Sequence, residues 1–410
     1  MTSSKRESTL WILAVACLIA GTWGLVNYLR KGHLVAAYGS YVPWGLWVAS
    51  YIYFIGLSAG AFLVSDLVYV FRVRQLETFG PPALLTALAC WVASMLSIWL
   101  DLGHPARVWR LIFRTNFGSV MGWMAWFYSA YFILLMAQLW LAMRPTMVQR
   151  ARTGSRLARL LCCHRGEYDE RAKQRDRHRM QLLGAAGIPL VIAFNGGAGA
   201  LFGVVGARPY WHSGLLPILF LTGALLSGAA LLAALTWLLR PSGSDRETGD
   251  RVVFLGRMIL PLVLLYMLLE FSEFTIVGYA SVPAHASSLE LVLFGPYWWV
   301  FWIIHVGFGI VVPLLLLVGK GRSPAAVATA GALIAITFLA VRVNIVVPGL
   351  AVEELHGLSR AYVDARLTFD YFPTLTEWLV QLWITALAGL LFLTGCCCLP
   401  VFSRMETSHG

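Results

Sequence analysis

The residues best suited to chemistry lie in one stretch, residues 99–114 (WLDLGHPARVWRLIFR). It places an acid, Asp101, and an imidazole, His104, close to the guanidinium of Arg107. A glycine and a proline among them predict that a helix ends here, because glycine tolerates a left-handed cap and proline disfavours helix in the preceding residue. Such groups suit a flat, partly polar ligand that arrives through lipid. An aromatic belt with anchoring arginines, common in membrane proteins, is the simpler interpretation.

A ligand of that kind also needs an apolar slot and a group that exchanges protons with water. Trp123, Trp126 and Tyr128 open the apolar stretch that follows the arginines, and Trp47 opens an earlier one. Indole and phenol rings supply flat apolar surface with one polar atom each. Together with Asp101 at the same membrane edge, these rings would complete the site.

Composition indicates which elements position these residues. Of the 410 residues, 59% are hydrophobic and 12% are charged, whereas a soluble domain has about 25% charged residues. A helix needs about 20 apolar residues to cross the bilayer core. We therefore predict an all-α, polytopic membrane protein. Ten spans are predicted, at residues 9–29, 44–71, 82–101, 120–142, 181–206, 213–239, 252–280, 295–319, 324–348 and 376–399.

Lysine and arginine predict the orientation of these spans, because both are more frequent in cytoplasmic loops. Most of them fall on one side when both termini are placed in the cytoplasm. Residues 144–180 carry much of the net charge of +11. A basic loop beside a membrane binds anionic lipid headgroups, so we predict no nucleic-acid role. Lys5 and Arg6 resemble the start of a signal peptide, but no convincing small-residue cleavage site follows, and we interpret the first span as a retained anchor.

The two halves of the chain share short motifs. LSAGA at residues 57–61 recurs as LSGAA at residues 226–230, and two later spans open with glycine and tryptophan. This pattern suggests a parallel repeat of two four-helix bundles with flanking helices, and chance similarity between small-residue helices is the alternative. The predicted domains are an anchor helix and outer loop (1–43), a first bundle (44–206), a second bundle (207–348) and an outer loop with the last helix (349–410).

Charges inside lipid are costly and often functional. The ionisable residues within the predicted spans that we consider candidates for proton transfer are Asp66, Glu270, Glu273, His305 and Arg342. Counted along the helices, Glu273 and Arg342 both lie about 10 Å below the outer ends of their spans. Glu270 and His305 both lie about 15 Å below the outer ends of their spans. We therefore predict a Glu273–Arg342 pair and that Glu270 and His305 are neighbours, with Asn344 close by. A proton path and a buried ion pair that fixes helix register explain them equally, whereas for Asp66, with Arg72 available, the structural interpretation is favoured.

No metal or redox cofactor of its own is predicted for the chain. Ligation of haem by two histidines needs both at one depth, and only His305 lies deep in a span. The seven cysteines lack the spacings of zinc and iron–sulfur sites. Motifs of phosphate-binding loops, serine hydrolases and zinc proteases are also absent from the sequence.

Four motifs together resemble those of the NrfD/PsrC family, the polysulfide reductase-type membrane subunits of respiratory oxidoreductases. They are VPWGLW at 42–47, GLSAG at 56–60, DLGHPAR at 101–107 and GSVMGWMAW at 118–126. The ten-span layout is similar to that of the longer branch of the family, which includes the hydrogenase-2 membrane subunit and DsrP-like proteins.

The resemblance implies a quinone-reactive anchor in a bacterial inner membrane, with the quinone site in the first bundle. Electrons would pass between menaquinone or ubiquinone and a periplasmic iron–sulfur, ferredoxin-like subunit, with or without coupled proton transfer. A catalytic subunit, often containing molybdenum, would be attached to that partner, and these cofactors would belong to the partners alone.

The resemblance also assigns residues. Tyr51 matches the family's quinone-contacting position on the second span, where some members have histidine, and Arg107 matches the loop that caps the pocket. Asp101 and His104 would exchange protons with the quinol. Outer loop 349–375 would offer charges for docking the partner, and a plain solvated loop is an equally simple interpretation.

Two other functions fit the sequence. Repeats and intramembrane charges also occur in secondary transporters and proton-conducting proteins. Against a transporter, the spans lack obvious broken helices at corresponding mid-membrane positions, although NGGAG at residues 195–199 is one glycine-rich candidate. A structural anchor with a vestigial pocket is the third. Co-purification of an iron–sulfur protein would argue against a transporter, and reduction of that protein by quinol would argue against a purely structural anchor.

Overall fold

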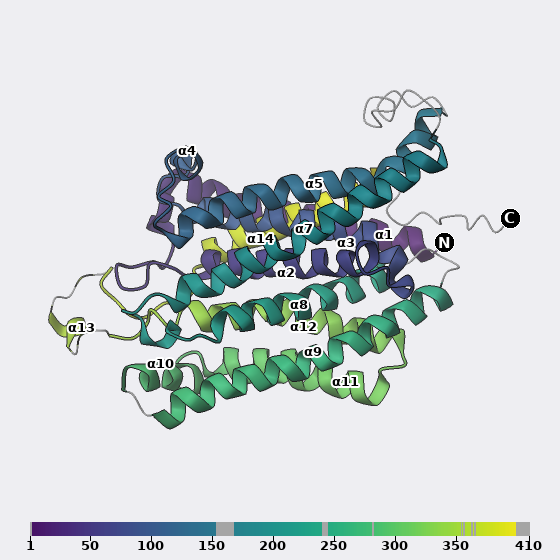
Figure 1. Cartoon of the computed structure of the whole chain (residues 1–410). Helices are drawn as coiled ribbons and strands as arrows, with labels where there is room; N and C mark the ends of the chain where they lie inside the picture. Colours follow the sequence, from purple (N-terminus) through teal and green to yellow (C-terminus); the bar gives the residue numbers. More distant parts are fainter. Residues whose placement is uncertain are drawn as a thin grey trace.

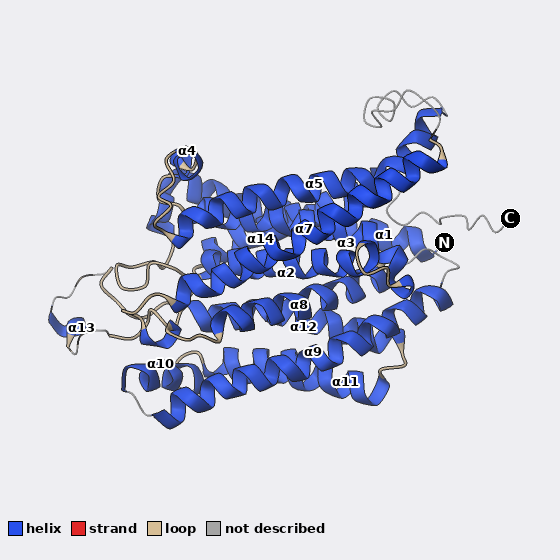
Figure 2. Cartoon of the chain, in the orientation of Figure 1, coloured by secondary structure: helices blue, strands red, loops and turns tan. Residues whose placement is uncertain are grey.

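Helices account for all regular structure in the part of the chain that the computed structural model describes, without a strand (Figures 1 and 2). That part comprises residues 2–152, 168–239, 245–280, 283–353, 355, 357–361, 364 and 366–398. The predicted all-α class is confirmed.

Ten helices among the described residues are long and apolar enough to cross a membrane, as predicted. They are α1 (Thr2–Lys31), α2 (Leu46–Tyr69), α3 (Gly80–Asp101), α5 (Val120–Arg152), α7 (Glu170–Gly203), α8 (Leu216–Leu238), α9 (Asp245–Ala280), η5 with α11 (Val300–Val311 and Val312–Lys320), α12 (Pro324–Val346) and α14 (Leu375–Cys398). Short helices connect them, namely η1 (Gly32–Val35), η2 (Arg74–Phe79), η3 (Pro105–Arg107), α4 (Arg110–Phe113), η4 (Pro209–Trp211), α10 (Pro283–Leu293) and α13 (Leu358–Ala361).

The basic segment 144–180 is more helical than expected. α5 continues to Arg152 and α7 begins at Glu170, so both helices extend well beyond the predicted spans. Arginine, lysine, glutamine and methionine are good helix formers, and hydropathy marks the end of the apolar part of a helix rather than the end of the helix. The middle of the predicted basic loop, residues 153–167, lies outside the described residues.

Local chemistry sets several helix ends. Asp169 caps α7, because its Oδ1 accepts a hydrogen bond from the Ala172 backbone N–H at 2.8 Å. Ser323 occupies the same position before α12 and is followed by Pro324 in the first turn, where a missing N–H costs nothing. α3 ends at Asp101, two residues before the glycine of the DLGHPAR motif.

α2 and α8 occupy the centre of the fold. α2 packs against α3, α7 and α8, and α8 packs against α7, α9 and α12. We call α2, α3, α5 and α7 the first group, and α8, α9, η5–α11 and α12 the second group. α1 and α14 pair with each other, and α14 covers α3. The predicted domain limits fall in connections between helices, and the division into two bundles stays a prediction.

The repeated small-residue motifs meet where α2 crosses α8. A Cβ atom added at Gly60 would collide with the backbone carbonyl of Ala224. A Cβ at Gly228 would lie 2.5 Å from the backbone of Gly60. Glycine at both positions therefore permits the two backbones to touch, as small residues do between membrane helices. The LSAGA and LSGAA motifs hold the two groups together.

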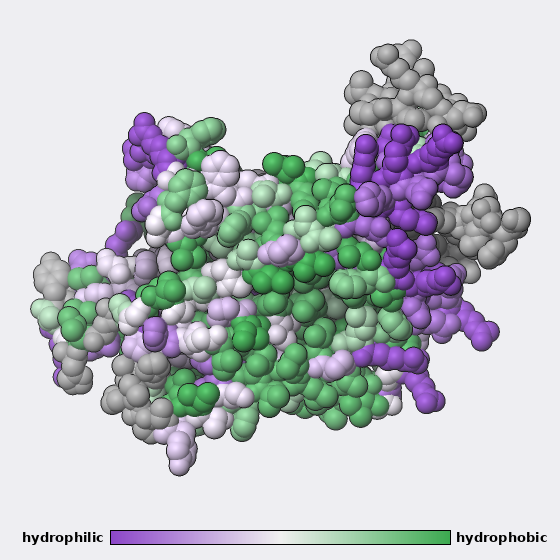
Figure 3. Space-filling model, in the orientation of Figure 1, coloured by the Kyte–Doolittle hydropathy of each residue, from purple (hydrophilic) through white to green (hydrophobic). Residues whose placement is uncertain are grey.

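A hydrophobic band covers the middle of the visible face, and hydrophilic residues gather where α5 and α7 extend beyond it (Figure 3). We call this the basic end, and the opposite end, with residues 102–119, the outer end. α14 also finishes at the basic end, where the Arg150 guanidinium donates to the Cys398 carbonyl at 2.7 Å. The chain is a multi-pass membrane protein, and the cytoplasmic position of the basic end stays a prediction.

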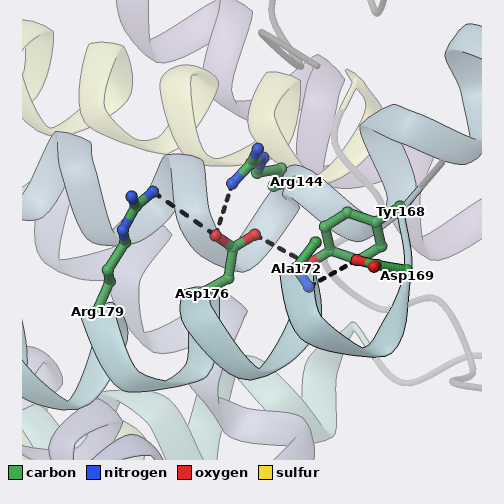
Figure 4. Close-up of polar contacts among 6 residues, drawn as sticks. All are labelled: Arg144, Tyr168, Asp169, Ala172, Asp176 and Arg179. Atoms are coloured by element: carbon green, nitrogen blue, oxygen red, sulfur yellow. Dashed lines mark hydrogen bonds and ion pairs between the residues drawn. The ribbon is translucent and has the colours of Figure 1, made fainter. Parts of the chain in front are cut away.

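A buried ion pair joins α5 to α7 at the basic end (Figure 4). Arg144 Nη1 lies 2.6 Å from Asp176 Oδ1, and the Tyr168 hydroxyl donates to Asp176 Oδ2 at 3.0 Å. Burial, followed by the contact with Asp176, raises the pKa of Tyr168 above its usual range, so the hydroxyl stays a donor. Arg179 Nη1 lies 4.0 Å from Asp176 Oδ1, and the Arg179 side chain is exposed. This cluster fixes the height of α5 relative to α7.

Candidate functional site

A pocket of about 430 Å³ opens at the outer end, within the connection between α3 and α5. This volume lies in the range of small-molecule sites, about 300–1,000 Å³. The pocket is lined by Leu102, Gly103, His104, Arg107, Val108, Arg110, Leu111, Arg114, Thr115, Asn116, Ser119, Met121 and Gly122. Of the residues predicted to bind the ligand, it contains His104 and Arg107.

Indole side chains hold the wall of this pocket. Trp99 Nε1 donates to the Pro105 carbonyl at 3.0 Å, which folds the chain back after α3. Trp123 Nε1 donates to the Phe117 carbonyl at 2.9 Å, and Trp126 Nε1 donates to Thr115 Oγ1 at 3.0 Å. Trp123 and Trp126 therefore position the pocket from the first turns of α5 without lining it.

The pocket is electropositive. Three guanidinium groups line it, those of Arg107, Arg110 and Arg114, and none of the described lining residues is acidic. Arg110 also lies over the Trp109 ring at 5.5 Å. Such a pocket attracts electron-rich oxygen atoms and donates hydrogen bonds to them.

Trp47 and Asp101 lie outside the pocket, at a junction of α1, α2, α3 and α14. The Trp47 ring packs against Tyr28 at 5.0 Å, Tyr38 at 5.7 Å and His33 at 6.0 Å. Asp101 Oδ1 is buried there without a hydrogen-bond partner. Burial, followed by the nearby Asp101 carboxyl, raises the pKa of Tyr38 above its usual range.

Glu377 completes this junction and was not predicted. Its carboxylate is fully buried and accepts hydrogen bonds from the Tyr371 hydroxyl at 2.5 Å and from the backbone N–H groups of Ala37 at 3.0 Å and Thr374 at 2.9 Å. Thr374 Oγ1 in turn accepts from the Glu377 N–H at 3.2 Å. This is a capping box, for which the T-x-x-E spacing at the start of α14 was an available signal.

Tyr51 and Tyr128 lie together at a third place, apart from the pocket and the α14 junction. Their hydroxyls share a hydrogen bond in the interior of the first group, where both side chains are buried. The Ser94 hydroxyl donates to the Tyr51 carbonyl at 2.9 Å and ties α3 to the same level. The eight residues predicted for the ligand thus divide among the pocket and its wall, the α14 junction, and this tyrosine pair.

Asp66 lies deep in the first group, 0% exposed, and neither carboxylate oxygen has a hydrogen-bond partner. The suggested contact with Arg72 is not formed, because Arg72 is exposed just beyond α2 with a positive φ of 57°. The Gln138 side chain on α5 interacts with the carboxyl, and a Cβ atom added at Gly184 on α7 would lie 2.6 Å from its Oδ1.

The predicted contact between Glu270 and His305 is confirmed. His305 Nε2 lies 3.3 Å from Glu270 Oε2. Both ring nitrogens of His305 lack an aligned hydrogen bond, so the two groups approach without hydrogen-bond geometry. His305 lies in η5, a wider π-helix, an irregularity that often occurs at functional sites. A cavity of about 10 Å³ beside it has room for about one water molecule.

The predicted Glu273–Arg342 pair is wrong. Glu273 Oε2 accepts a hydrogen bond from the Ser213 hydroxyl at 2.7 Å. Arg342 is 0% exposed, and its three side-chain nitrogens have no hydrogen-bond partner. Its guanidinium lies over the Phe220 ring at 4.2 Å and interacts electrostatically with Glu270. Asn344, expected close by, is also buried with an unpartnered amide.

No group of three or more His, Cys, Asp or Glu side chains that could hold a metal ion occurs within the described ranges.

Comparison with known proteins gives one family. A sequence model of the polysulphide reductase NrfD family matches residues 34–353. One of the subunits of the selenate reductase of Mesobacillus selenatarsenatis is 36% identical over 95% of this chain and 93% of its own length. The integral membrane subunit of an Hdr-like menaquinol oxidoreductase from Archaeoglobus fulgidus is 28% identical over 86% of this chain and 84% of its own length. The integral membrane subunit of a menaquinone reductase from Nitratidesulfovibrio vulgaris is 22% identical over 98% of this chain and 93% of its own length.

Proposed function

The chain belongs to the polysulphide reductase NrfD family, and we propose that it is the quinone-reactive membrane subunit of a respiratory oxidoreductase. It exchanges electrons between the quinone pool and an iron–sulfur partner at the outer end. The observation that carries the proposal is the 36% identity, over 95% of the chain, with one of the subunits of a selenate reductase. Relatives named for menaquinol and menaquinone support a quinone as substrate.

We assign the quinone headgroup to the pocket between α3 and α5. His104 and Arg107 line it and can hydrogen-bond the headgroup oxygens. Trp123 and Trp126 keep the pocket wall in place through their indole N–H groups. Oxidation of a quinol releases two electrons and two protons, so the site needs a proton acceptor close to water. The exposed imidazole of His104 meets this need.

The other predicted residues have supporting roles. Asp101 directly precedes the pocket lining and faces the α14 junction, and we assign it as a second proton acceptor beside the pocket. Trp47 packs the same junction. The Tyr51–Tyr128 pair joins α2 to α5 in the interior of the first group.

Partners follow from the comparisons. One of the relatives is a subunit of a selenate reductase, which supports a partner protein that exchanges the electrons. We assign that role to an iron–sulfur, ferredoxin-like subunit that carries a catalytic, often molybdenum-containing subunit. Outer loop 349–375 is its docking surface, although residues 354, 356, 362, 363 and 365 lie outside the described ranges. With the basic end on the cytoplasmic side of a bacterial inner membrane, the basic residues of α7 contact anionic lipid.

The second group is our candidate for proton transfer. His305 and Arg342 are buried, Glu270 is partly buried in the same neighbourhood, and His305 lines a cavity with room for water. Their clustering supports a hydrated polar centre, since buried water bridges unsatisfied polar groups. Glu273 contributes indirectly, through Ser213.

Quinone binding tests the site. Quinones quench tryptophan fluorescence, so titration of the purified protein with a soluble menaquinone analogue reports binding near Trp123 and Trp126. We expect Arg107→Gln to weaken the apparent affinity at least tenfold and Arg322→Gln, an exposed arginine at the basic end, to leave it unchanged. Equal affinities in all three proteins would remove the pocket from the proposal.

A further inference from the structure

Residues 366–374, just before α14, lie at the outer end against the segment that leads into α2. The Ser40 backbone N–H donates to the Arg366 carbonyl at 2.9 Å. Further along, the Phe369 ring stacks on the Tyr41 ring, with 4.4 Å between their centroids and an interplanar angle of 12°. These contacts hold the segment without any helix of its own, and we call it the strap.

Tyr371 fixes the strap to both helix groups and to α14. It is 4% exposed. Its hydroxyl donates to Glu377 at 2.5 Å and accepts from the Leu46 backbone N–H at 2.8 Å. Its carbonyl accepts at 2.9 Å from the hydroxyl of Tyr297, which lies just before η5 in the second group. A Cβ atom at Gly45 would collide with the Tyr371 hydroxyl, so glycine leaves room for this phenol.

The side chains next to Tyr371 are exposed. Asp370 and Phe372 lie on either side of it and are open to the surroundings, and so is Arg366 at the start of the strap. Such alternation is typical of extended backbone with one buried face. An exposed aromatic ring between charges of both signs suits a protein partner, because aromatic residues and arginine are enriched in interfaces. The strap thus presents one face to a partner and one face to the α14 junction.

Rings of the α14 junction connect Tyr371 to the end of α3. The Tyr371 ring stacks on Tyr38, with 5.9 Å between centroids, and the Tyr38 ring packs against Trp47 at 5.7 Å. Trp47 in turn packs against Tyr28, whose hydroxyl donates to the Leu100 carbonyl at 2.5 Å. Carbonyls in the last turn of a helix have no partner within it. Tyr28 therefore fixes the last turn of α3 from outside.

The pocket lining begins directly after this turn. Leu102 is the first lining residue, two positions after Leu100, and His104 follows it. The hydroxyl of Tyr38 is buried without an aligned hydrogen bond and interacts electrostatically with Asp101. A movement of the strap is thereby passed through packed rings to the residues that line the pocket, as coupling in proteins is carried by contiguous packed side chains.

We propose that the iron–sulfur partner docks on the strap and that Tyr371 couples this docking to the quinone pocket. This inference rests on the proposed function. Partner and quinone exchange electrons, so both must bind close together at the outer end. Tyr371 is a positioning residue that acts on the pocket through Tyr38 and the end of α3. Because coupling between two binding sites is reciprocal, the partner tightens quinone binding and bound quinone tightens the partner by the same factor.

Quinone affinity with and without the partner tests this coupling. Equilibrium dialysis measures binding of a soluble menaquinone analogue to the complete complex and to the full chain purified alone. We expect the wild-type complex to bind at least fivefold more tightly than the chain alone, and Tyr371→Phe to bring the two affinities within about twofold. Phenylalanine keeps the ring against Tyr38 and removes both hydrogen bonds of the hydroxyl.

Tyr210→Phe is the matched control. It removes an outer-end hydroxyl that donates to the Asn344 carbonyl at 3.2 Å, away from the strap, and should keep the wild-type ratio of affinities. A loss of stability alone would weaken binding to the complex and to the chain equally. An unchanged ratio in Tyr371→Phe, or a wild-type ratio of one, would overturn the coupling and leave the proposed function intact. Absence of binding to the complete complex would overturn the proposed function itself.

Hydrogen exchange in the full chain gives a second test that does not need the partner. The Arg107 backbone N–H donates to the His104 carbonyl at 2.9 Å within the pocket lining, so its exchange reports local opening of the pocket. We expect Tyr371→Phe to accelerate this exchange at least fivefold, and Tyr210→Phe by about twofold or less. Equal exchange in the wild type and Tyr371→Phe would show that the strap does not position the pocket.

Discussion

Replacement of Asp176 by asparagine tests how firmly the basic end ties α5 to α7. The carboxylate accepts hydrogen bonds from Arg144 at 2.6 Å and Tyr168 at 3.0 Å (Figure 4). The side chains of Arg144 and Asp176 are 10% and 7% exposed. Arg144 also lies over the Trp140 ring at 5.1 Å, so the guanidinium cannot turn to water without losing that contact as well.

The expected loss is large because the substitution leaves a buried charge. Removal of one partner from a buried ion pair costs about 3–5 kcal/mol, and we expect about 3 kcal/mol because asparagine keeps one acceptor. Glu170→Gln is the matched control. It breaks a 2.5 Å pair with Lys173 on the same helix, where the side chains are 85% and 53% exposed. Such a pair contributes about 0.5 kcal/mol, and the helix dipole up to about 0.5 kcal/mol more.

Hydrogen exchange measures this difference locally. Backbone amides of the first turns of α7 exchange through local opening, so exchange rates report its free energy. A loss of about 3 kcal/mol corresponds to roughly 100-fold faster exchange in Asp176→Asn. Glu170→Gln should accelerate exchange about fivefold or less. Equal acceleration in the two variants would refute the reasoning that burial of the pair determines its contribution.

Three further substitutions test the packing and the buried polar groups. Gly60→Ala places a methyl group against the α8 backbone and should lower thermal stability by about 1–3 kcal/mol or prevent folding, whereas Gly196→Ala, which meets nothing within 4 Å, should not; equal melting temperatures would contradict the close crossing. Glu377→Gln leaves at least one donor at the α14 junction unsatisfied and should lose about 1–3 kcal/mol in thermal unfolding; wild-type stability would contradict its role. Glu270→Gln should lower thermal stability, because it removes the carboxylate that interacts with the buried Arg342 guanidinium, and adding Arg342→Met should recover most of the loss; a double variant weaker than the single one would show that the two charges are not coupled.

Hydropathy and helix geometry predicted much of this fold. The ten spans follow from apolar length, and counting along helices placed Glu270 level with His305. The same count failed for Glu273 and Arg342, because it gives depth and not direction around the helix axis. Glu273 instead accepts from Ser213, which precedes α8. The LSAGA and LSGAA motifs suggested a repeat, and the structure shows that the two motifs contact each other.

The candidate site could be predicted only in part. Types and spacing identified His104 and Arg107 in the pocket, because the lining comes from one continuous segment, the connection after α3 and the first turn of α5. Trp47 was assigned to the ligand because nothing near it in the sequence reveals that α14, more than 300 residues later, lies against it: Trp47 Nε1 donates to the Glu377 carbonyl at 3.2 Å. The contact between Ser58 and Tyr131 was missed since both residues are unremarkable until α2 and α5 are seen to face each other.

The central claim is electron exchange between quinone and an iron–sulfur partner, and electron paramagnetic resonance of the purified complex tests it most directly. The complex is extracted from native membranes in mild detergent, and its iron–sulfur signals are followed after addition of quinol or quinone. We predict an attached iron–sulfur protein whose clusters change oxidation state with quinone, at a rate lowered at least tenfold by His104→Gln. A protein purified without metal or partner, or clusters that do not respond to quinone, would contradict the account.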